Sequence, residues 1–300
     1  MLALSLNVRR VKTVMRDACK LSQTNRRTQR WMAIKLNRLL LTGAAGGLGK
    51  VLRPRLAEVA HIVRVSDLAE LGDAAAHEEL ARCDLGDYDA MLALLDCVDA
   101  VVHLGGISTD GPFEPILNAN IRGMYNLYEA ARIHGVKRVL FASSNHVVGF
   151  HKQAERIDAS AALRPDGNYG VSKAFGESLS RFYFDRYGIE TVCMRIGSSF
   201  PKPIDHRMLS TWLSYDDLTA LIGCALFAPT VGHSIVYAAS NNVPSWWDNR
   251  YAAHLGWTPK DSSEPFRAEI ERTVPRLDAD DPAAVYQGGK FVKLGPFPTT

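Results

Sequence analysis

The segment Leu39–Gly49, with the sequence LLLTGAAGGLG, predicts the fold of a large part of the chain. Three consecutive leucines are typical of a strand that is buried on both faces, as in a parallel sheet. Gly43, Gly46 and Gly49 follow with G-x-x-G-x-x-G spacing, which lets the backbone turn sharply and approach a pyrophosphate closely. We expect a helix over residues 50–60, whose N-terminal N–H groups would face that phosphate.

A second strand, over residues 61–65, leads into Asp67, which lies 18 residues after Gly49. Dinucleotide-binding folds place there the acid that holds the adenosine ribose hydroxyls. An ordinary glycine loop is the alternative interpretation, but strand, loop, helix, strand and acid occur in the required order. Asp67 also predicts NAD rather than NADP, because a carboxylate repels a 2′-phosphate and the next residue, Leu68, could not hold one.

Composition narrows the class of protein. The chain has 300 residues, 47% of them hydrophobic and 22% charged, which suits a globular domain with a small appendage. No apolar run approaches the ~20 residues of a membrane span. The five cysteines form no C-x-x-C pair and the nine histidines show no H-E-x-x-H spacing. We therefore expect reduced thiols, a cytoplasmic location and no metal site.

The formal net charge of +3 is unevenly distributed along the chain. Residues 1–31 hold eight basic residues and one acid, so this segment carries +7 and leaves −4 for the rest. The remainder therefore shows no basic surface for nucleic acid. The basic segment resembles a transit peptide or a basic arm. We interpret residues 1–31 as a disordered upstream extension without a role in the fold.

From residue 39 onward, strand and helix patterns alternate, which predicts a Rossmann-type doubly wound parallel sheet with helices on both faces. Later strands are expected at residues 100–104, 138–142, 190–194 and 234–239, and helices at 116–133, 169–187, 215–227 and around Trp246-Trp247. The tail over residues 278–300 is expected to wrap the surface. We expect an NAD-binding domain over residues 32–195 and a small substrate-binding region with a tail over residues 196–300.

Two further loops are placed to contact a dinucleotide. Asp84 and Leu85 follow the short third strand, where a hydrogen bond and an apolar contact could hold an adenine. Capping of the helix at residues 88–95 by Asp84 is an equally open alternative. Gly105-Gly106 follow the fourth strand, where small residues allow the backbone to lie close to a ligand.

Tyr169 and Lys173 are spaced so that both side chains share one face of the expected helix. A phenol has a pKa near 10 and is a poor base, but a neighbouring ammonium or an oxidised nicotinamide ring stabilises the phenolate. Lowering that pKa by two units takes about 2.7 kcal/mol, which one partly buried charge can supply. Ser144, at the end of a buried strand, can hydrogen-bond the reacting oxygen while Tyr169 takes its proton. A surface Tyr–Lys pair is the alternative.

Together these residues make the chain resemble the extended short-chain dehydrogenase/reductase superfamily. In that superfamily a glycine-rich loop binds the cofactor, and serine, tyrosine and lysine form the catalytic group. The resemblance implies four catalytic residues: Ser144, Tyr169, Lys173 and Asn120, the last matching a helix asparagine that supports a proton-relay water. It implies an NAD site formed by Gly43, Gly46, Gly47, Leu48, Gly49, Asp67, Asp84, Leu85, Leu104, Gly105, Tyr169 and Lys173.

Segments 143–150, 169–177 and 207–214 narrow the resemblance to the uronate dehydrogenase family, as do Trp246-Trp247-Asp248 and Gln287-Gly288-Gly289. The likeness spans residues 35–297. Segment 207–214 is the specific one, because it lies outside the shared cofactor fold. Gly47 is a departure, since a polar glutamine is expected there; it would remove one cofactor hydrogen bond without removing the activity.

The resemblance implies oxidation of a uronate, D-glucuronate or D-galacturonate, bound as a pyranose. Tyr169 would take the proton of the anomeric hydroxyl, the hydride would pass to NAD, and the product would be an aldarolactone. Arg207 would bind the sugar carboxylate through two parallel N–H donors. The other substrate-binding residues would be Ser108, Ser144, Asn145, His146 and Ser198. The alternatives are a strand-end role for His146, satisfied by backbone, and a solvated surface position for Arg207.

Two other functions compete with this one. A nucleotide-sugar epimerase or dehydratase shares the catalytic group but needs a larger C-terminal region than the 105 residues after Arg195. A non-catalytic dinucleotide sensor with a protein partner has no need of an intact serine, tyrosine and lysine set. For the enzyme we expect a small-molecule partner, no nucleic acid, no membrane, and a homo-oligomer.

Overall fold

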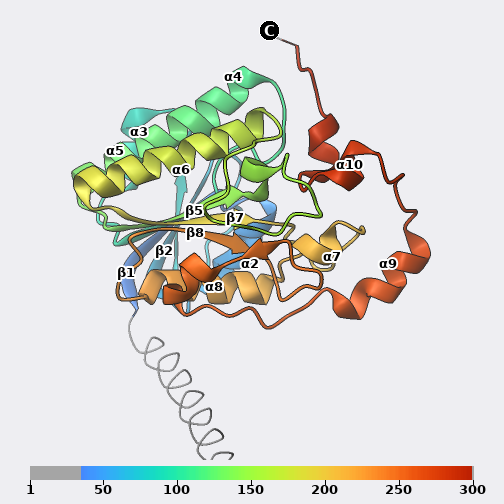
Figure 1. The fold of residues 1–300 in the computed structure, drawn as a ribbon. Helices are drawn as coiled ribbons and strands as arrows, with labels where there is room; N and C mark the ends of the chain where they lie inside the picture. Colours follow the sequence, from blue (N-terminus) through green and yellow to red (C-terminus); the bar gives the residue numbers. More distant parts are fainter. Residues whose placement is uncertain (1–34, 299–300) are drawn as a thin grey trace, which may run out of the picture.

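The computed structural model describes residues 35–298 (Figure 1). The expectation for residues 1–31 lies outside this range and stays a prediction. Within it, no helix is both long and apolar enough to cross a membrane. The same stretch of chain contains no cluster of three or more His, Cys, Asp or Glu side chains that could hold a metal ion.

A seven-stranded parallel sheet forms the centre of the molecule. In chain order its strands are β1 (Leu36–Thr42), β2 (Ala60–Asp67), β3 (Glu78–Arg82), β4 (Ala100–His103), β5 (Arg138–Ser144), β7 (Glu190–Ile196) and β8 (His233–Ala238). Their order across the sheet is β3-β2-β1-β4-β5-β7-β8. The chain builds outward from β1 to β3, then returns to β4 on the other side of β1. This reversal confirms the Rossmann-type fold and places a crevice between β1 and β4.

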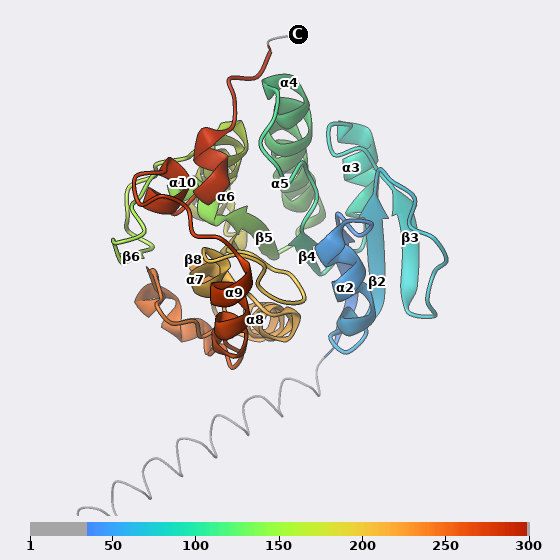
Figure 2. The same ribbon diagram turned by 90° about the vertical axis from the view of Figure 1, so that its right-hand side faces the viewer.

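Helices cover both faces of this sheet (Figure 2). On one face lie α2 (Gly47–Leu56) and α8 (Tyr215–Phe227), and on the other α3 (Tyr88–Leu94), α5 (Gly123–His134) and α6 (Asn168–Tyr187). The three leucines of β1 have no exposed surface: Leu39 and Leu41 pack with α2 and α8, while Leu40 packs with α3 and α5. Alternation of side chains along a strand buried on both faces explains the uninterrupted apolar run.

Three expected helices differ in the structure. The first, α2, ends at Leu56 rather than residue 60, because Ala60 already pairs with Leu36 at the start of β2. The helix expected over 116–133 is divided into α4 (Phe113–Ile116), the π-helical turn η1 (Leu117–Arg122) and α5. No helix surrounds Trp246-Trp247: β9 (Trp247–Asp248) pairs there with β6 (Ile157–Asp158), and the 3₁₀ helix η3 (Arg250–Leu255) follows.

The expected division at residue 195 stays a prediction. The sheet continues across it, because β8 pairs with β7 and α8 packs into the same core as β1. Beyond the sheet the chain forms short elements only: η4 (Glu264–Phe266), α9 (Arg267–Thr273), α10 (Pro282–Val285) and η5 (Gly289–Lys293).

The C-terminal segment does more than wrap the surface, contrary to expectation. Gln287 is fully buried. Its amide nitrogen donates to the carbonyl oxygens of Lys152 (3.1 Å) and Glu155 (2.9 Å), and its amide oxygen accepts from Trp247 Nε1 (2.9 Å). Tyr286 forms a β-bridge with Lys152. These bonds hold α10 and η5 against the loop that follows β5, at the edge of the crevice.

Candidate active site

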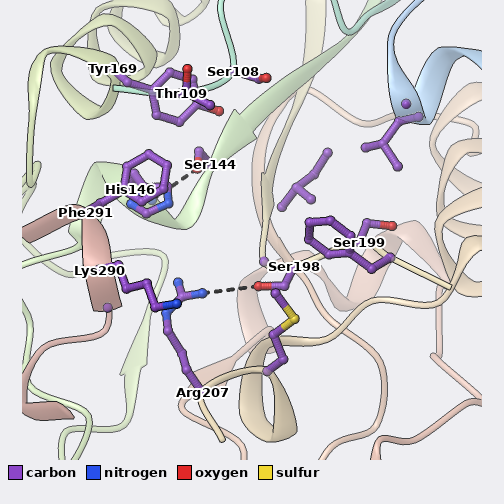
Figure 3. A pocket seen from close by; sticks show the side chains of 18 of the residues that line it. Ser108, Thr109, Ser144, His146, Tyr169, Ser198, Ser199, Arg207, Lys290 and Phe291 are labelled. Atoms are coloured by element: carbon purple, nitrogen blue, oxygen red, sulfur yellow. Dashed lines mark hydrogen bonds between the residues drawn. The ribbon is translucent and has the colours of Figure 1, made fainter. Parts of the chain in front are cut away.

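A cleft of about 1840 Å³ opens where the strands of the parallel sheet end. The glycine-rich loop after β1 lines one end, and Arg207 and the C-terminal segment line the other. Ser144, His146 and Tyr169 lie along the same cleft (Figure 3), and Lys173 lines it as well. The structure therefore brings most of the residues expected for a dinucleotide, for catalysis and for a sugar acid into one continuous space, although Asn120 and Asn145 do not line it.

The glycine-rich loop packs too tightly for side chains at two of its glycines. Gly43 has a φ of +71°, and a Cβ there would lie 2.7 Å from the carbonyl carbon of Leu104. A Cβ on Gly49 would lie 2.2 Å from the carbonyl oxygen of Gly43. Gly47 has open space around it, so its departure from the expected glutamine leaves the loop's packing intact. The Gly46 cap supplies no side-chain hydrogen bond to α2, so the helix keeps N–H groups for a ligand.

The carboxylate of Asp67 is oriented by two backbone groups. Its Oδ2 accepts from Ala45 N (2.9 Å) and its Oδ1 from Ala69 N (3.1 Å). It lies at the cleft wall beside the glycine-rich loop, as expected for a ribose-binding acid. Leu68, the next residue, is 54% exposed and offers no cation to a phosphate.

The other expected cofactor residues line the cleft as well: Leu48, Asp84, Leu85, Leu104 and Gly105. Asp84 does not cap α3, so that alternative is wrong. Asp87 Oδ1 accepts from Ala90 N (3.0 Å) as the cap, whereas Asp84 Oδ1 accepts from Gly86 N (2.9 Å). Gly105 N donates to Thr42 Oγ1 (3.1 Å), which ties the loop after β4 to the end of β1.

Tyr169 and Lys173 lie on the first turns of α6, and both are buried. Lys173 Nζ lies 5.6 Å from the ring centroid of Tyr169 and 5.0 Å from that of Phe141. Burial raises the pKa of Tyr169 to about 12, against an opposing hydrogen bond from Ser144. Burial lowers the pKa of Lys173 to about 8. Burial thus favours the neutral form of both side chains when no ligand is bound. A phenolate at Tyr169 requires added positive charge nearby.

The start of α6 is fixed by the loop that follows β4. Asp110 Oδ1 accepts from Tyr169 N (2.9 Å), and Asn168 Nδ2 donates to the carbonyl oxygen of Gly111 (3.0 Å). A Cβ on Gly167 would lie 2.0 Å from Asp110 Oδ2, so this loop lies directly against the helix start. These contacts set where the Tyr169 ring enters the cleft. Asp110 had no motif that singled it out in the sequence.

Asn120 lies in the π-helical turn η1 and is 7% exposed. Its Oδ1 accepts from Ile107 N (2.8 Å), while its Nδ2 donates to Ile107 O (3.0 Å) and Ser172 Oγ (2.9 Å). Its amide therefore connects the loop after β4 with α6. A π-helical turn inside a helix is frequent at functional sites, which suits this position beside the cleft.

Arg207 is bonded to three different segments at the far end of the cleft. Its Nε donates to the carbonyl oxygen of Gln287 (2.7 Å) and its Nη1 to Ser198 Oγ (3.1 Å; Figure 3). When the oxygen and nitrogen of the Asn145 amide are exchanged, both atoms have hydrogen-bond partners: Oδ1 accepts from Arg207 Nη2 (2.6 Å) and Nδ2 donates to Ile196 O (3.1 Å). Burial lowers the pKa of Arg207. The alternative of a solvated surface arginine is wrong.

The side chain of His146 is held by a carboxylate. The alternative in which His146 is a strand-end residue satisfied by backbone is therefore wrong. Its Nδ1 lies 2.7 Å from Asp166 Oδ2. Its ring stacks on Phe291 with centroids 3.8 Å apart and meets the edge of Tyr169 at 5.8 Å. Ser108 lines the cleft near Tyr169 (Figure 3).

Residues 39–214 match the NAD dependent epimerase/dehydratase family. The chain belongs to that family. The matched stretch holds the glycine-rich loop, Ser144, Tyr169, Lys173 and Arg207 but ends before the C-terminal segment that carries Phe291.

Individual relatives match a larger share of the chain than the family does. A uronate dehydrogenase of Pseudomonas syringae pv. tomato is 61% identical over 262 residues, which are 87% of this chain and 95% of that protein. The crystal structure of uronate dehydrogenase from Agrobacterium tumefaciens matches with a TM-score of 0.87 at 51% identity, over 89% of this chain and 100% of that one. A tyrosine-to-alanine mutant of that enzyme, complexed with NAD, matches with a TM-score of 0.86 at 50% identity, over 88% and 100%.

Four residues that sequence reasoning did not place in the site lie in or against it in this family member: Asp110, Asp166, Lys290 and Phe291. Lys290 and Phe291 directly follow the Gln287-Gly288-Gly289 stretch that carried part of the resemblance, so that stretch was a usable signal. Asp110 and Asp166 lie in loops without a pattern. Only tertiary structure brings them to α6 and to His146.

Proposed function

We propose that this chain is an NAD-dependent dehydrogenase that oxidises the anomeric hydroxyl of a uronate, D-glucuronate or D-galacturonate, to the aldarolactone. The observation that carries the proposal is the position of Arg207. Its guanidinium is anchored by Gln287, Ser198 and Asn145 at the end of a cleft that also contains Ser144 and Tyr169. Relatives that are named uronate dehydrogenase match this chain over nearly their whole length.

The glycine-rich loop and Asp67 fit NAD. The side-chain-free surface at Gly43 and Gly49 and the open N-terminus of α2 would receive the pyrophosphate. The Asp67 carboxylate would accept from the adenosine ribose hydroxyls, with Asp84 and Leu85 beside the adenine and Leu104 and Gly105 near the centre of the cofactor. When bound, NAD supplies the hydride acceptor and a positive charge at its nicotinamide ring.

Tyr169 is the general base in this proposal, and Ser144 hydrogen-bonds the same reacting oxygen. Lys173, one turn along α6, stabilises the phenolate and reaches the nicotinamide ribose. Asn120 supports the water that relays the proton to solvent. The oxygen–hydrogen bond of the anomeric hydroxyl breaks towards Tyr169 as the hydride leaves the anomeric carbon. The carbonyl of the lactone forms from the electron pair that remains on oxygen.

Arg207 binds the sugar carboxylate. A guanidinium has five N–H donors, and residues of the described chain use three of them, which leaves two for a carboxylate. Loss of water around the guanidinium strengthens the attraction for an anion. Ser108, Asn145, His146 and Ser198 would contact the sugar hydroxyls between Arg207 and Tyr169.

A spectrophotometric assay tests the proposal. Purified protein is mixed with NAD and, in turn, D-glucuronate, D-galacturonate, glucose, galactose and a nucleotide sugar, and absorbance of the reduced cofactor is followed at about 340 nm. We expect turnover of the two uronates and little turnover of the neutral sugars. An epimerase or dehydratase returns the hydride to its product, so conversion of the nucleotide sugar, read by chromatography, without net reduction of NAD would favour that function. Binding of NAD without conversion of any sugar would favour a sensor.

The expectation of a homo-oligomer also stays a prediction. Apolar and aromatic side chains are exposed on two neighbouring helices of one face: Tyr125 and Ile133 on α5, and Phe182 and Tyr187 on α6. Light scattering after size exclusion would give the mass in solution. A cytoplasmic location is likewise proposed and is tested by fractionation.

A further inference from the structure

The ring of His146 is fixed from several sides. Phe291 stacks on one face with the ring planes 24° apart, and the Tyr169 ring meets it edge-on. The carbonyl oxygen of His146 accepts from Asp166 N (3.3 Å), so backbone and side chain of Asp166 both hold the same residue. Nδ1 therefore has one fixed partner, the carboxylate of Asp166.

Asp166 is enclosed more tightly than an ordinary loop aspartate. Its side chain has no exposed surface. A Cβ on Gly149 would lie 2.0 Å from Asp166 Oδ2, and a Cβ on Gly288 would lie 1.9 Å from the same oxygen. Two backbone segments thus approach this carboxylate at positions where only glycine fits. Asp166 Oδ1 has no hydrogen-bond partner within residues 35–298, so His146 is the polar side chain that the carboxylate contacts directly.

A buried carboxylate accepts hydrogen bonds and cannot donate them. Nδ1 of His146 must therefore carry a proton, which it donates to Asp166 Oδ2. Burial lowers the pKa of His146, and the cation of Arg207 acts in the same direction, against the opposing charges of Asp166 and Asp110. The imidazole is then neutral near pH 7, and a neutral imidazole with its proton on Nδ1 has a lone pair on Nε2.

Nε2 is open to the cleft. It has no hydrogen-bond partner in the described part of the chain, but unlike Asp166 Oδ1 it is not fully buried. His146 lines the cleft between Tyr169 and Arg207 (Figure 3). A ligand hydroxyl in that space would meet an acceptor at Nε2 and not a donor.

We propose that Asp166 is a positioning residue that fixes His146 as the tautomer protonated at Nδ1, so that Nε2 accepts a hydrogen bond from a hydroxyl of the bound sugar acid. The substrate in this statement rests on the proposed function, but the tautomer does not. The arrangement selects for a substrate that donates at this point.

The tautomer is tested without substrate, on the intact protein with ¹⁵N-labelled histidine. Long-range ¹H–¹⁵N spectra distinguish a protonated from an unprotonated ring nitrogen, and the signals of His146 are those lost in His146→Gln. We expect a neutral ring with its proton on Nδ1 near pH 7.5. In Asp166→Asn, whose amide can donate to Nδ1, we expect a shift towards protonation at Nε2. A wild-type ring that is doubly protonated, or protonated at Nε2 alone, overturns the proposal.

Kinetics test whether Asp166 acts through His146. Asp166→Asn, which has the same shape, is expected to lower kcat/KM for glucuronate by about 10- to 100-fold, the range for a buried hydrogen-bonding group that loses its partner. In the His146→Gln background the same change should cost less than threefold. NAD affinity and melting temperature are measured for every variant, and Asp185→Asn on the exposed surface of α6 is the matched control.

The outcomes separate the two proposals. Equal fold losses from Asp166→Asn in both backgrounds would assign Asp166 a structural role alone and overturn the inference. Unchanged kcat/KM together with an unchanged tautomer in Asp166→Asn would overturn it as well. A wild-type protein that turns over no uronate would end the proposed function, while the tautomer of His146 would still decide the role of Asp166.

Discussion

Replacement of Arg207 is the sharpest test of how this protein recognises an acidic sugar. Arg207→Lys keeps one positive charge but loses the planar pair of donors, and a flexible ammonium cannot bond Gln287, Ser198 and Asn145 together. One hydrogen bond to a charged group contributes about 1.5–3 kcal/mol. Loss of the paired geometry therefore predicts a fall of ~10²-fold in kcat/KM for glucuronate, or about 2–3 kcal/mol of transition-state stabilisation.

The ratio of two substrates makes this test specific. In Arg207→Ala, kcat/KM for glucuronate should fall at least as far as in Arg207→Lys. The slow oxidation of glucose should change little, because glucose has no carboxylate for Arg207 to bind. A collapsed site would reduce both rates equally. Arg181→Lys, in an exposed pair with Asp185 on α6, is the matched control and should leave both rates unchanged.

Two results would refute the reasoning about Arg207. The first is a wild-type protein that oxidises glucose as well as glucuronate. The second is an Arg207→Ala variant whose kcat/KM for glucuronate stays within threefold of wild type while its melting temperature and NAD affinity are normal. Either result would mean that the carboxylate is bound elsewhere in the cleft.

Four further outcomes are expected. Tyr169→Phe should abolish turnover while NAD still binds in a fluorescence titration, and a residual tenth of wild-type kcat would exclude Tyr169 as the base. Asp67→Ala should raise KM for NAD and reduce the preference over NADP; unchanged kinetics with both cofactors would contradict the ribose contact. Gly49→Ala should lower the stability by about 1–3 kcal/mol in urea unfolding, because its Cβ would overlap Gly43 O, whereas Gly47→Ala should be nearly neutral. Lys173→Met should be inactive yet more stable than wild type at pH 7 by up to about 3 kcal/mol, because burial lowers the pKa of Lys173 from 10.5 to about 8 and a buried charge destabilises the wild type. The difference in unfolding free energy should shrink between about pH 8 and pH 10.5, as Lys173 loses its proton in the folded protein before it does so in the unfolded chain. A difference that stays constant with pH would refute this explanation.

The fold and the cofactor end of the cleft were predictable because local patterns encode them. A run such as Leu39–Leu41 has one favourable placement, buried on both faces of a parallel sheet, and Gly43 and Gly49 after it leave no room for side chains. Tyr169 and Lys173 were found through helical spacing, supported by Ser144 at the end of a buried strand. In each case the residues that act together lie within a few turns of one another.

The sugar end was less predictable because its parts come from distant segments. Arg207 was expected there, but its bond to Gln287 joins positions 80 residues apart, and Phe291 reaches His146 from a segment expected on the surface. The π-helical turn at Asn120 has no periodicity of its own that separates it from the flanking helices. Asp166 lies in a short turn, and its importance depends on two glycines, Gly149 and Gly288, far apart in the chain.

The buried amide of Gln287 has a consequence for how this enzyme can diversify. It holds α10 and η5 at the edge of the cleft, so one part of the wall around the proposed sugar site is formed by a short stretch, residues 285–293, that contributes nothing to the sheet. Exchange of that stretch between related enzymes could reshape the sugar pocket while β1, α2 and the Tyr169–Lys173 helix stay untouched. One part of the sugar pocket can thus vary independently of the segments that carry the redox chemistry.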